Sequence, residues 1–284
     1  MSSSHLLWLA THALDIGAMT VFFYCFRNEK PFMIFELVSG ARMNLSYVRI
    51  GGVARDLPGT FLERTHTFTK EFPSRMNEYE TLLKENIIWK KRTVDVGIIS
   101  AEDAVDYGLS GPSLRGSGVN WDVRKAEPYS CYDKYDFTVP LGKNGDVYDR
   151  YRVRIEEMYQ SNRIVQQGIN LIPKGNFIAR IPDITLPSKE DVSTKMESMI
   201  HHFKIITDGI KPPEGEIYAC VEAPKGELGF YIVSDGSNHP YRLKIRPPSF
   251  VNLEALPKMV EGRLLPDVVA IIGSLDIVLG EIDR

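Results

Sequence analysis

Cysteine is scarce in this chain, which holds three among 284 residues. Cys25, Cys131 and Cys220 are too far apart in sequence to form a CxxC pair, and their number is odd. This usage argues against a thiolate-bound metal or a redox pair within the chain and fits a reducing compartment. We therefore expect this chain to bind no metal.

The chain also has no large excess of either positive or negative charge. The 34 basic residues stand against 37 acidic residues, which gives a formal net charge of -3. Such a balance provides no electrostatic footprint for nucleic acid or for an anionic lipid surface, so we expect no nucleic-acid partner. Repeats and low-complexity segments are absent too, and 43% hydrophobic with 25% charged residues is typical of a globular chain.

One apolar stretch, residues 5–26, is long enough to raise the question of a membrane span. It contains His5, His12 and Asp15, and no basic flank precedes it. These polar residues and the missing flank favour a buried helix over a span. The same start lacks the basic region and the small-residue cleavage site of a signal peptide.

Apolar spacing, Ser caps and Gly-containing turns predict the remaining elements. Helices are expected at residues 31–43, 61–86, 149–171 and 188–208 and after Ser100, strands at 216–221, 229–234 and 241–245, a long irregular region at 109–146 and a buried segment at 267–279. This order predicts an α+β fold, a helix-rich core with a long-helix bundle and a small antiparallel sheet. We expect one domain over residues 1–284, truncated at its N-terminus because the chain begins inside an apolar helix.

Polar residues recur within the first apolar stretch. Helical spacing places Asp15 one turn from Thr11, His12 and Met19, so an acid, an imidazole and a hydroxyl are expected on one side of the helix. A buried carboxylate there must be paired, hydrogen-bonded or protonated, and it is a natural proton donor beside a reducible substrate. A satisfied polar cluster inside a helix bundle explains the same residues without any chemistry.

Other local motifs are weaker. The Gly-rich residues 111–118 provide amides for an anion beside Arg115, but a loop that packs through positive φ angles explains them better. His201 and His202 point about 100° apart on a helix and favour packing or surface roles over metal binding. Residues 222–227 are typical of a hairpin connection.

In combination, seven stretches are specific: residues 11–20 (THALDIGAMT), 39–43 (SGARM), 114–118 (LRGSG), 148–151 (YDRY), 196–203 (MESMIHHF), 222–227 (EAPKGE) and 276–284 (DIVLGEIDR). In this order they closely resemble the 49-kDa-type subunit of respiratory complex I, the proton-pumping NADH:quinone oxidoreductase. The resemblance covers the whole chain and implies a fold like the large subunit of nickel–iron hydrogenases.

The resemblance also shows a departure from the hydrogenases. Residues 222–226 are similar to the hydrogenase Glu-Ala-Pro-Arg-Gly turn, but Val278 and Glu281 stand where the terminal Asp-Pro-Cys-x-x-Cys motif has its cysteines. An aliphatic side chain and one carboxylate cannot replace two soft thiolate ligands of nickel. We therefore expect this chain to hold no nickel. The alternative enzyme is the large subunit of a membrane-bound hydrogenase.

In the complex I family the emptied metal cavity is the head-group end of a quinone chamber. The motif match assigns the proton-donating Asp to Asp15, as the catalytic residue. It implies quinone-binding residues at Thr11, His12, Met19, Phe23, Asp276 and Val278. Quinone is then the substrate, and the electrons come from an iron–sulfur cluster on a partner subunit.

The resemblance implies an enzyme subunit that is inactive alone. Its expected partners are other complex I subunits, above all the terminal iron–sulfur-cluster subunit and the membrane-arm subunit at the quinone entrance. The family's N-terminal third, which holds the Tyr and His donors, is absent, so a separate N-terminal polypeptide is a further expected partner if the gene is split. A non-catalytic structural subunit is the second alternative. The expected location is the cytoplasmic face of the bacterial inner membrane or the matrix side of the mitochondrial inner membrane.

Overall fold

The computed structural model describes residues 1–26, 30–179, 181 and 184–283, without the side chains of residues 23–30. Its helices are, in chain order, α1 (Ser2–Ile16), α2 (Met19–Phe26), α3 (Lys30–Ser39), α4 (Phe61–Lys84), α5 (Ile87–Thr93), α6 (Ala101–Asp106), α7 (Gly111–Gly116), α8 (Val123–Ala126), the 3-10 turn η1 (Tyr132–Lys134), α9 (Val147–Leu171), α10 (Lys189–Thr194), α11 (Met196–Asp208), α12 (Pro248–Glu254), α13 (Leu256–Val260), α14 (Leu265–Leu275) and α15 (Leu279–Ile282).

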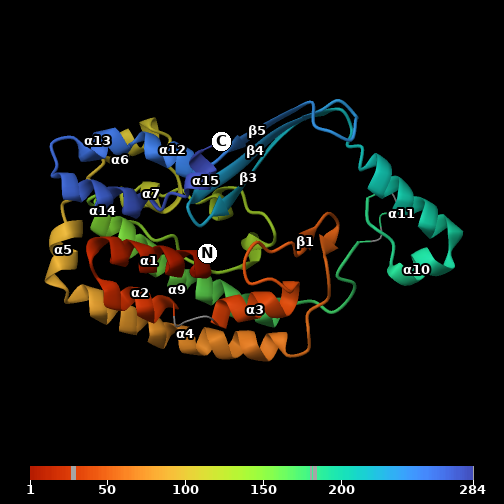
Figure 1. The fold of residues 1–284 in the computed structure, drawn as a ribbon, viewed down its shortest axis with the longest axis horizontal. Coiled ribbons are helices and arrows are strands. Elements are labelled where there is room, and N and C mark those ends of the chain that lie inside the picture. The colour runs from red at the N-terminus through yellow and green to blue at the C-terminus, as the bar shows by residue number, and fades with distance from the viewer. Residues whose placement is uncertain (27–29, 180, 182–183, 284) are drawn as a thin grey trace.

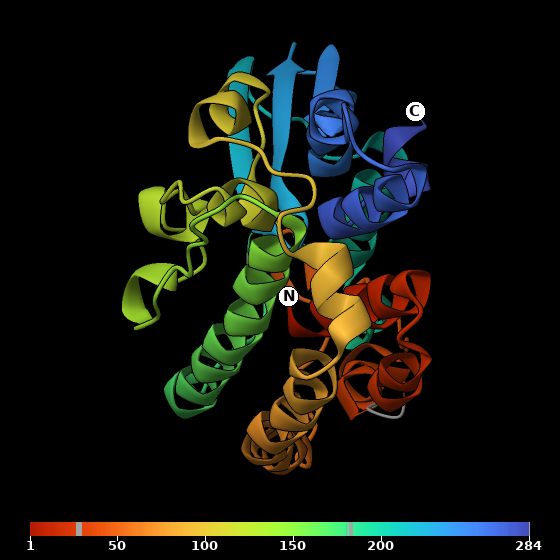
Figure 2. The ribbon, with the colours of Figure 1, turned by 90° about the vertical axis from the view of Figure 1, so that its left-hand side faces the viewer.

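Two long helices, α4 and α9, form the body together with α1, α2 and α14 (Figures 1 and 2). The buried face of α4 carries Phe72, Met76, Tyr79 and Leu83 at helical spacing. These residues join one apolar cluster with side chains of α1, α5, α9 and α14. Packing the helices around this cluster removes these apolar side chains from water.

A second apolar cluster lies under the C-terminal helices. It combines residues of α6, α7, α13 and α14, the start of α9 and neighbouring loops, and α14 contributes to both clusters through Ala270 and Ile271. Helix α14 therefore joins the α1 side of the body to the C-terminal side.

The main sheet is antiparallel with the strand order β3 (Gly215–Ala223), β4 (Gly226–Ser234) and β5 (Arg242–Arg246). Its register pairs Ala223 with Gly226, so a two-residue turn joins β3 to β4. A small ladder pairs β1 (Val48–Arg49) with β2 (Gly52–Val53). Figure 1 shows one end of the main sheet at the body near α12 and the other end reaching towards α11.

The predicted α+β class, helix-rich with small antiparallel sheets, is confirmed. Helices α4, α6 and α9 and strands β3, β4 and β5 match the expected elements, and Ser100 Oγ accepts a hydrogen bond from Asp103 N as the predicted cap. The single helix expected at residues 5–26 is wrong, because Gly17 adopts φ 96° and ends α1. The helix expected at 188–208 is likewise two helices, because the backbone at Lys195 is extended.

Two further expectations need correction. The region at 109–146 is not irregular throughout, since it holds α7, α8 and η1. The helix expected at 31–43 ends at Ser39. Among the described residues, no helix combines the length and the apolar character that crossing a membrane requires.

Candidate functional site

Helix α1 divides the predicted site residues between its two faces. His12 is buried with 1% of its surface exposed, whereas Thr11 and Asp15 are exposed. The expectation of an acid, an imidazole and a hydroxyl on one side is therefore wrong for His12, and the expected burial of Asp15 is wrong in this chain. Thr11 and Asp15 lie four positions apart and do share a face.

His12 is held among aromatic rings. Its ring stacks on Trp8 at 5.2 Å between centroids and meets the edge of Trp89 at 5.4 Å. Burial, together with the positive charges of Arg154 and Arg150, lowers the pKa of His12 to about 3. His12 is therefore neutral at pH 7 and serves packing better than proton donation.

Asp15 has the opposite environment. Partial burial raises the pKa of its carboxyl above the ordinary value, so this carboxyl keeps its proton to a higher pH than a free aspartate does. Nearby, the Thr11 hydroxyl donates to the carbonyl oxygens of Leu7 and Trp8 at 3.1 and 3.0 Å. Asp15 thus presents an acidic group at the surface of the body, next to a hydroxyl already engaged by its own helix.

Helix α14 packs directly on α1. Trp8 Nε1 donates to Gly273 O at 2.6 Å. A Cβ atom added at Gly273 would lie 2.4 Å from His12 Nδ1, so this close approach requires glycine. The contact fixes α14 on the middle of α1, at Trp8 and His12.

That C-terminal segment begins with a sharp turn at Asp276. Asp276 has φ 57° and ends α14. Lys225 Nζ donates to its carbonyl oxygen at 2.9 Å and forms an ion pair with its Oδ1 at 2.5 Å. The Asp276 carboxylate, 8% exposed, is therefore engaged by the EAPKG turn.

The remaining predicted residues lie at the surface. Met19 at the start of α2 is 57% exposed and Val278 is 45% exposed, so both are open to a ligand or a partner. The side chain of Phe23 lies outside the described residues. Packing of α1 on α14 buries His12, and the ion pair with Lys225 engages Asp276.

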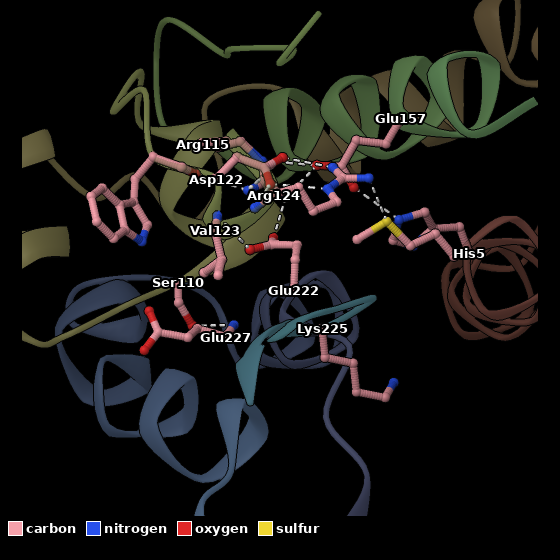
Figure 3. A network of polar contacts seen from close by, with 12 residues as sticks. His5, Ser110, Arg115, Asp122, Val123, Arg124, Glu157, Glu222, Lys225 and Glu227 are labelled. Atoms are coloured by element: carbon pink, nitrogen blue, oxygen red, sulfur yellow. Dashed lines mark hydrogen bonds and ion pairs between the residues drawn. The ribbon is translucent and has the colours of Figure 1, made fainter. Parts of the chain in front are cut away.

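A buried cluster of charges lies at the other end of α1. It joins His5 of α1, Arg115 of α7 and Glu157 of α9 to Glu222 of β3, with Asp122 and Arg124 beside them (Figure 3). Arg115 Nε donates to Glu157 Oε1 at 2.8 Å, and its Nη2 donates to Glu222 Oε1 at 2.8 Å. Elements that are far apart in sequence are therefore held together through one arginine.

Burial and the neighbouring charges act differently on each group of this cluster. Burial alone would raise the pKa of Glu157, but Arg115 and the hydrogen bond from His5 hold it well below its ordinary value. Burial lowers the pKa of His5, although Glu157 opposes the shift. Glu222 has a raised pKa because of burial and the neighbouring carboxylates of Asp122 and Glu157. The ion pairs of this cluster connect α1, α7, α9 and β3. Removing one partner would leave an uncompensated buried charge.

Sequence reasoning missed this cluster. For residues 111–118 the sequence favoured a loop that packs against a neighbour over a site for an anion. The structure agrees with a packing role, because a Cβ at Gly111 would lie 2.4 Å from Gly226 Cα. Arg115 nevertheless binds carboxylates of its own chain. One usable signal was present: Arg150, Arg154 and Glu157 recur one turn apart on a helix that must be buried on that side, and all three are buried.

Comparisons with known proteins show the family of the chain. The family described as respiratory-chain NADH dehydrogenase, 49 Kd subunit, matches residues 15–284. Among similar proteins, the D subunit of NADH-quinone oxidoreductase from Geotalea uraniireducens is 55% identical over 282 residues, which cover 99% of this chain and 72% of the relative. The corresponding protein of Geobacter sulfurreducens is 54% identical with the same coverage.

A more distant relative gives the same result. The protein of the same name from Nitrosococcus oceani is 51% identical over 309 residues, covering 99% of this chain and 74% of the relative. The predicted resemblance is confirmed over nearly the whole chain. The chain belongs to the family of the 49-kDa subunit of respiratory-chain NADH dehydrogenase.

Proposed function

We propose that this chain forms the quinone head-group site of an NADH:quinone oxidoreductase and donates a proton to the quinone through Asp15. The observation that carries the proposal is the exposed Asp15 carboxyl with its raised pKa, on a helix packed against α14 in a chain of the 49-kDa subunit family. Asp15 is exposed, which leaves it accessible to a substrate or a partner. Family membership favours this function over the hydrogenase and structural alternatives.

The reaction requires two electrons and two protons to convert a quinone to a quinol. An iron–sulfur cluster on a partner subunit supplies the electrons. Asp15 gives its proton to a reduced quinone oxygen as the O–H bond forms, and the second proton comes from a donor outside this chain. Proton transfer from a positioned acid lowers the barrier because the reduced quinone oxygen would otherwise carry a negative charge.

The chain's other residues position this donor. The glycine contact at Gly273 fixes α1 on α14, and neutral His12 fills the space between them. Lys225 fixes the turn at Asp276, so that Val278 is presented at the surface. Thr11, Met19 and Val278 are exposed and are the proposed contacts of the head group, and Phe23 is proposed as a contact on the family motif alone. His12 and Asp276 are buried and have a supporting role in this proposal.

The partners and the location follow from the same proposal. The chain acts within complex I, next to the terminal iron–sulfur-cluster subunit and the membrane-arm subunit at the quinone entrance. It lies at the cytoplasmic face of the bacterial inner membrane or the matrix side of the mitochondrial inner membrane. Quinone reduction at this site is coupled to proton pumping by the complex, and the isolated chain is inactive.

A photoreactive quinone analogue tests the site directly in the purified complex. The label is expected within residues 11–23 or 276–278, and excess unlabelled quinone is expected to suppress it. Helix α11, remote from α1 (Figure 1), is the internal control and is expected to stay unlabelled. Quinone-competed labelling found only on other subunits would contradict the proposal.

A further inference from the structure

Helix α9 carries two arginines in the interior of the body. Arg150 and Arg154 lie one helical turn apart, and neither side chain has exposed surface. Buried arginines are normally paired with carboxylates, because burial removes the water that stabilises their charge. In the part of the chain that the structure describes, the hydrogen bonds of both guanidinium groups instead go to neutral oxygens.

Arg150 has a partner for each of its nitrogens. Its Nε donates to Ser274 Oγ at 2.9 Å, and its Nη1 and Nη2 donate to Gly145 O and Gly97 O at 2.8 and 2.9 Å. Ser274 lies in the last turn of α14, two residues before Asp276. Arg150 therefore fastens α9 to the end of α14, which is a structural role.

Arg154 lacks such partners. Its Nη1 donates to Arg150 O at 3.4 Å, and its Nε and Nη2 are buried without a hydrogen-bond partner among the described residues. The guanidinium carbon lies 4.4 Å from the centre of the Trp8 ring. A cation–π contact offsets part of the cost of burial, but two donors remain unmet. A role in packing alone does not explain why a charged group stands here.

The carboxylates that attract Arg154 are already engaged by other cations. Burial lowers the pKa of Arg154, and the charges of Asp276 and Glu157 oppose this shift. Asp276 forms its ion pair with Lys225, and Glu157 forms its own with Arg115. Arg154 therefore contributes a positive charge that no carboxylate of the described chain binds directly.

Arg154 has links to both segments that are predicted to bind quinone. It contacts Trp8 of α1, whose carbonyl oxygen accepts a hydrogen bond from the Thr11 hydroxyl at 3.0 Å. Asp276 is the carboxylate that acts on it most strongly. The buried charge thus lies on the inner side of α1, and the exposed Asp15 lies on the outer side of the same helix.

We propose that the buried charge of Arg154 stabilises the negative charge that a quinone gains on reduction, across α1 and without contact with the quinone. This inference rests on the proposed function. Two electrons from the iron–sulfur cluster of a partner subunit leave negative charge on the two quinone oxygens until two protons bind. A fixed positive charge in an interior without water acts on such charge at a longer range than an exposed one.

The expected effect is moderate because a helix separates the two charges. An α-helix with its side chains is about 10 Å across. Two unit charges about 10 Å apart, at an effective dielectric constant of about 20, change an equilibrium constant roughly tenfold. For a one-electron step, a tenfold change corresponds to about 59 mV in reduction potential.

Arg154→Met in the assembled complex tests the proposal. Methionine is an unbranched apolar side chain that fills much of the same space without a charge. NADH:quinone turnover is expected to fall roughly tenfold, whereas NADH oxidation by an artificial acceptor that takes electrons upstream is expected to be unchanged. Arg154→Lys keeps the charge and is expected to retain most of the turnover.

Arg152 provides the matched control on the same helix. Its side chain is exposed and forms an ion pair with Glu80 at 3.0 Å at the surface of the body. Arg152→Met removes one positive charge as well, but water screens that charge. This variant is expected to reduce quinone at the parent rate.

A series of quinones with different reduction potentials separates an electrostatic effect from a packing effect. Losing a positive charge lowers the reduction potential of the bound quinone, so a quinone of higher potential is expected to restore part of the turnover of Arg154→Met. A packing defect would reduce turnover by the same factor with every quinone. The variant is also expected to assemble as well as the parent, because an unpaired buried charge does not stabilise the fold.

Each outcome decides the inference. Parent-rate turnover in Arg154→Met, an equal loss with every quinone, or failure of this variant to assemble would overturn it. If the quinone analogue still labels residues 11–23 or 276–278 of the parent complex, the proposed function stands and only the inference fails. Quinone-competed labelling of other subunits alone would overturn both.

Discussion

Glu157 of α9 accepts hydrogen bonds from Arg115 of α7 and His5 of α1 inside the body, so its carboxylate connects these three helices. Removing one partner from a buried ion pair leaves the others uncompensated and costs about 3–5 kcal/mol. Glu157→Gln is therefore expected to lower the free energy of unfolding of the chain by this amount, measured by urea titration.

Glu156 on the same helix provides the control because it is exposed. Glu156→Gln is expected to change the free energy of unfolding by no more than about 0.5 kcal/mol. Equal losses for the two variants would show that the buried cluster has no special role.

His12 predicts a dependence of stability on pH. Its pKa falls from 6.5 to about 3 on folding, so the unfolded chain binds a proton between these values that the folded chain does not. Stability therefore falls as the pH drops from 6.5 towards 3, by at most about 1.4 kcal/mol per pH unit from this group.

His12→Phe keeps an aromatic ring in place and removes the titration. The unfolding free energy of the parent chain minus that of the variant is expected to decrease as the pH falls below 6.5, because only the parent chain contains His12. Urea titrations from about pH 7 to about pH 4 measure it. A difference that is constant with pH would mean that His12 is not a neutral buried group.

At the scale of elements, the contact between α1 and α14 depends on Gly273. A methyl group there overlaps His12 Nδ1, so Gly273→Ala is expected to destabilise the chain by about 1–3 kcal/mol through overpacking. Gly280→Ala is the matched control, because a Cβ at Gly280 meets no atom within 4 Å. Thermal unfolding of both variants measures the effect, and equal midpoints would contradict the close contact.

Local periodicity predicted the elements that depend on local spacing. The apolar repeat of α4 and the Ser100 cap of α6 are signals within one or two turns of a helix. The end of α1 had a local signal in Gly17, but the run at 5–26 is apolar on both sides of it and therefore resembles one continuous helix. The β1 and β2 ladder was also missed, since strands of two residues have no periodicity.

The site was predictable only in part for a related reason. His12 and Asp15 lie about 60° apart around a helix, so spacing alone groups them. The edge of the buried face falls between them, and that edge is set by α14 and α5, which are distant in sequence. The charge cluster depends on the same long-range packing, and the family motif located Asp15 where spacing left its role open.

At the scale of the whole molecule, the body presents Asp15 at its surface. That residues 1–284 form one domain stays a prediction. The proposed proton transfer to quinone requires the assembled complex, so the decisive experiment is performed there.

Asp15→Asn in the assembled complex tests the central claim most directly. The amide keeps the shape of the carboxyl and removes the donor proton, so NADH:quinone turnover is expected to fall by about 10²–10⁴-fold. NADH oxidation by an artificial acceptor that takes electrons upstream is expected to be unchanged, which controls for assembly. An assembled variant that reduces quinone at the parent rate would contradict the account and leave Asp15 as an ordinary surface carboxylate.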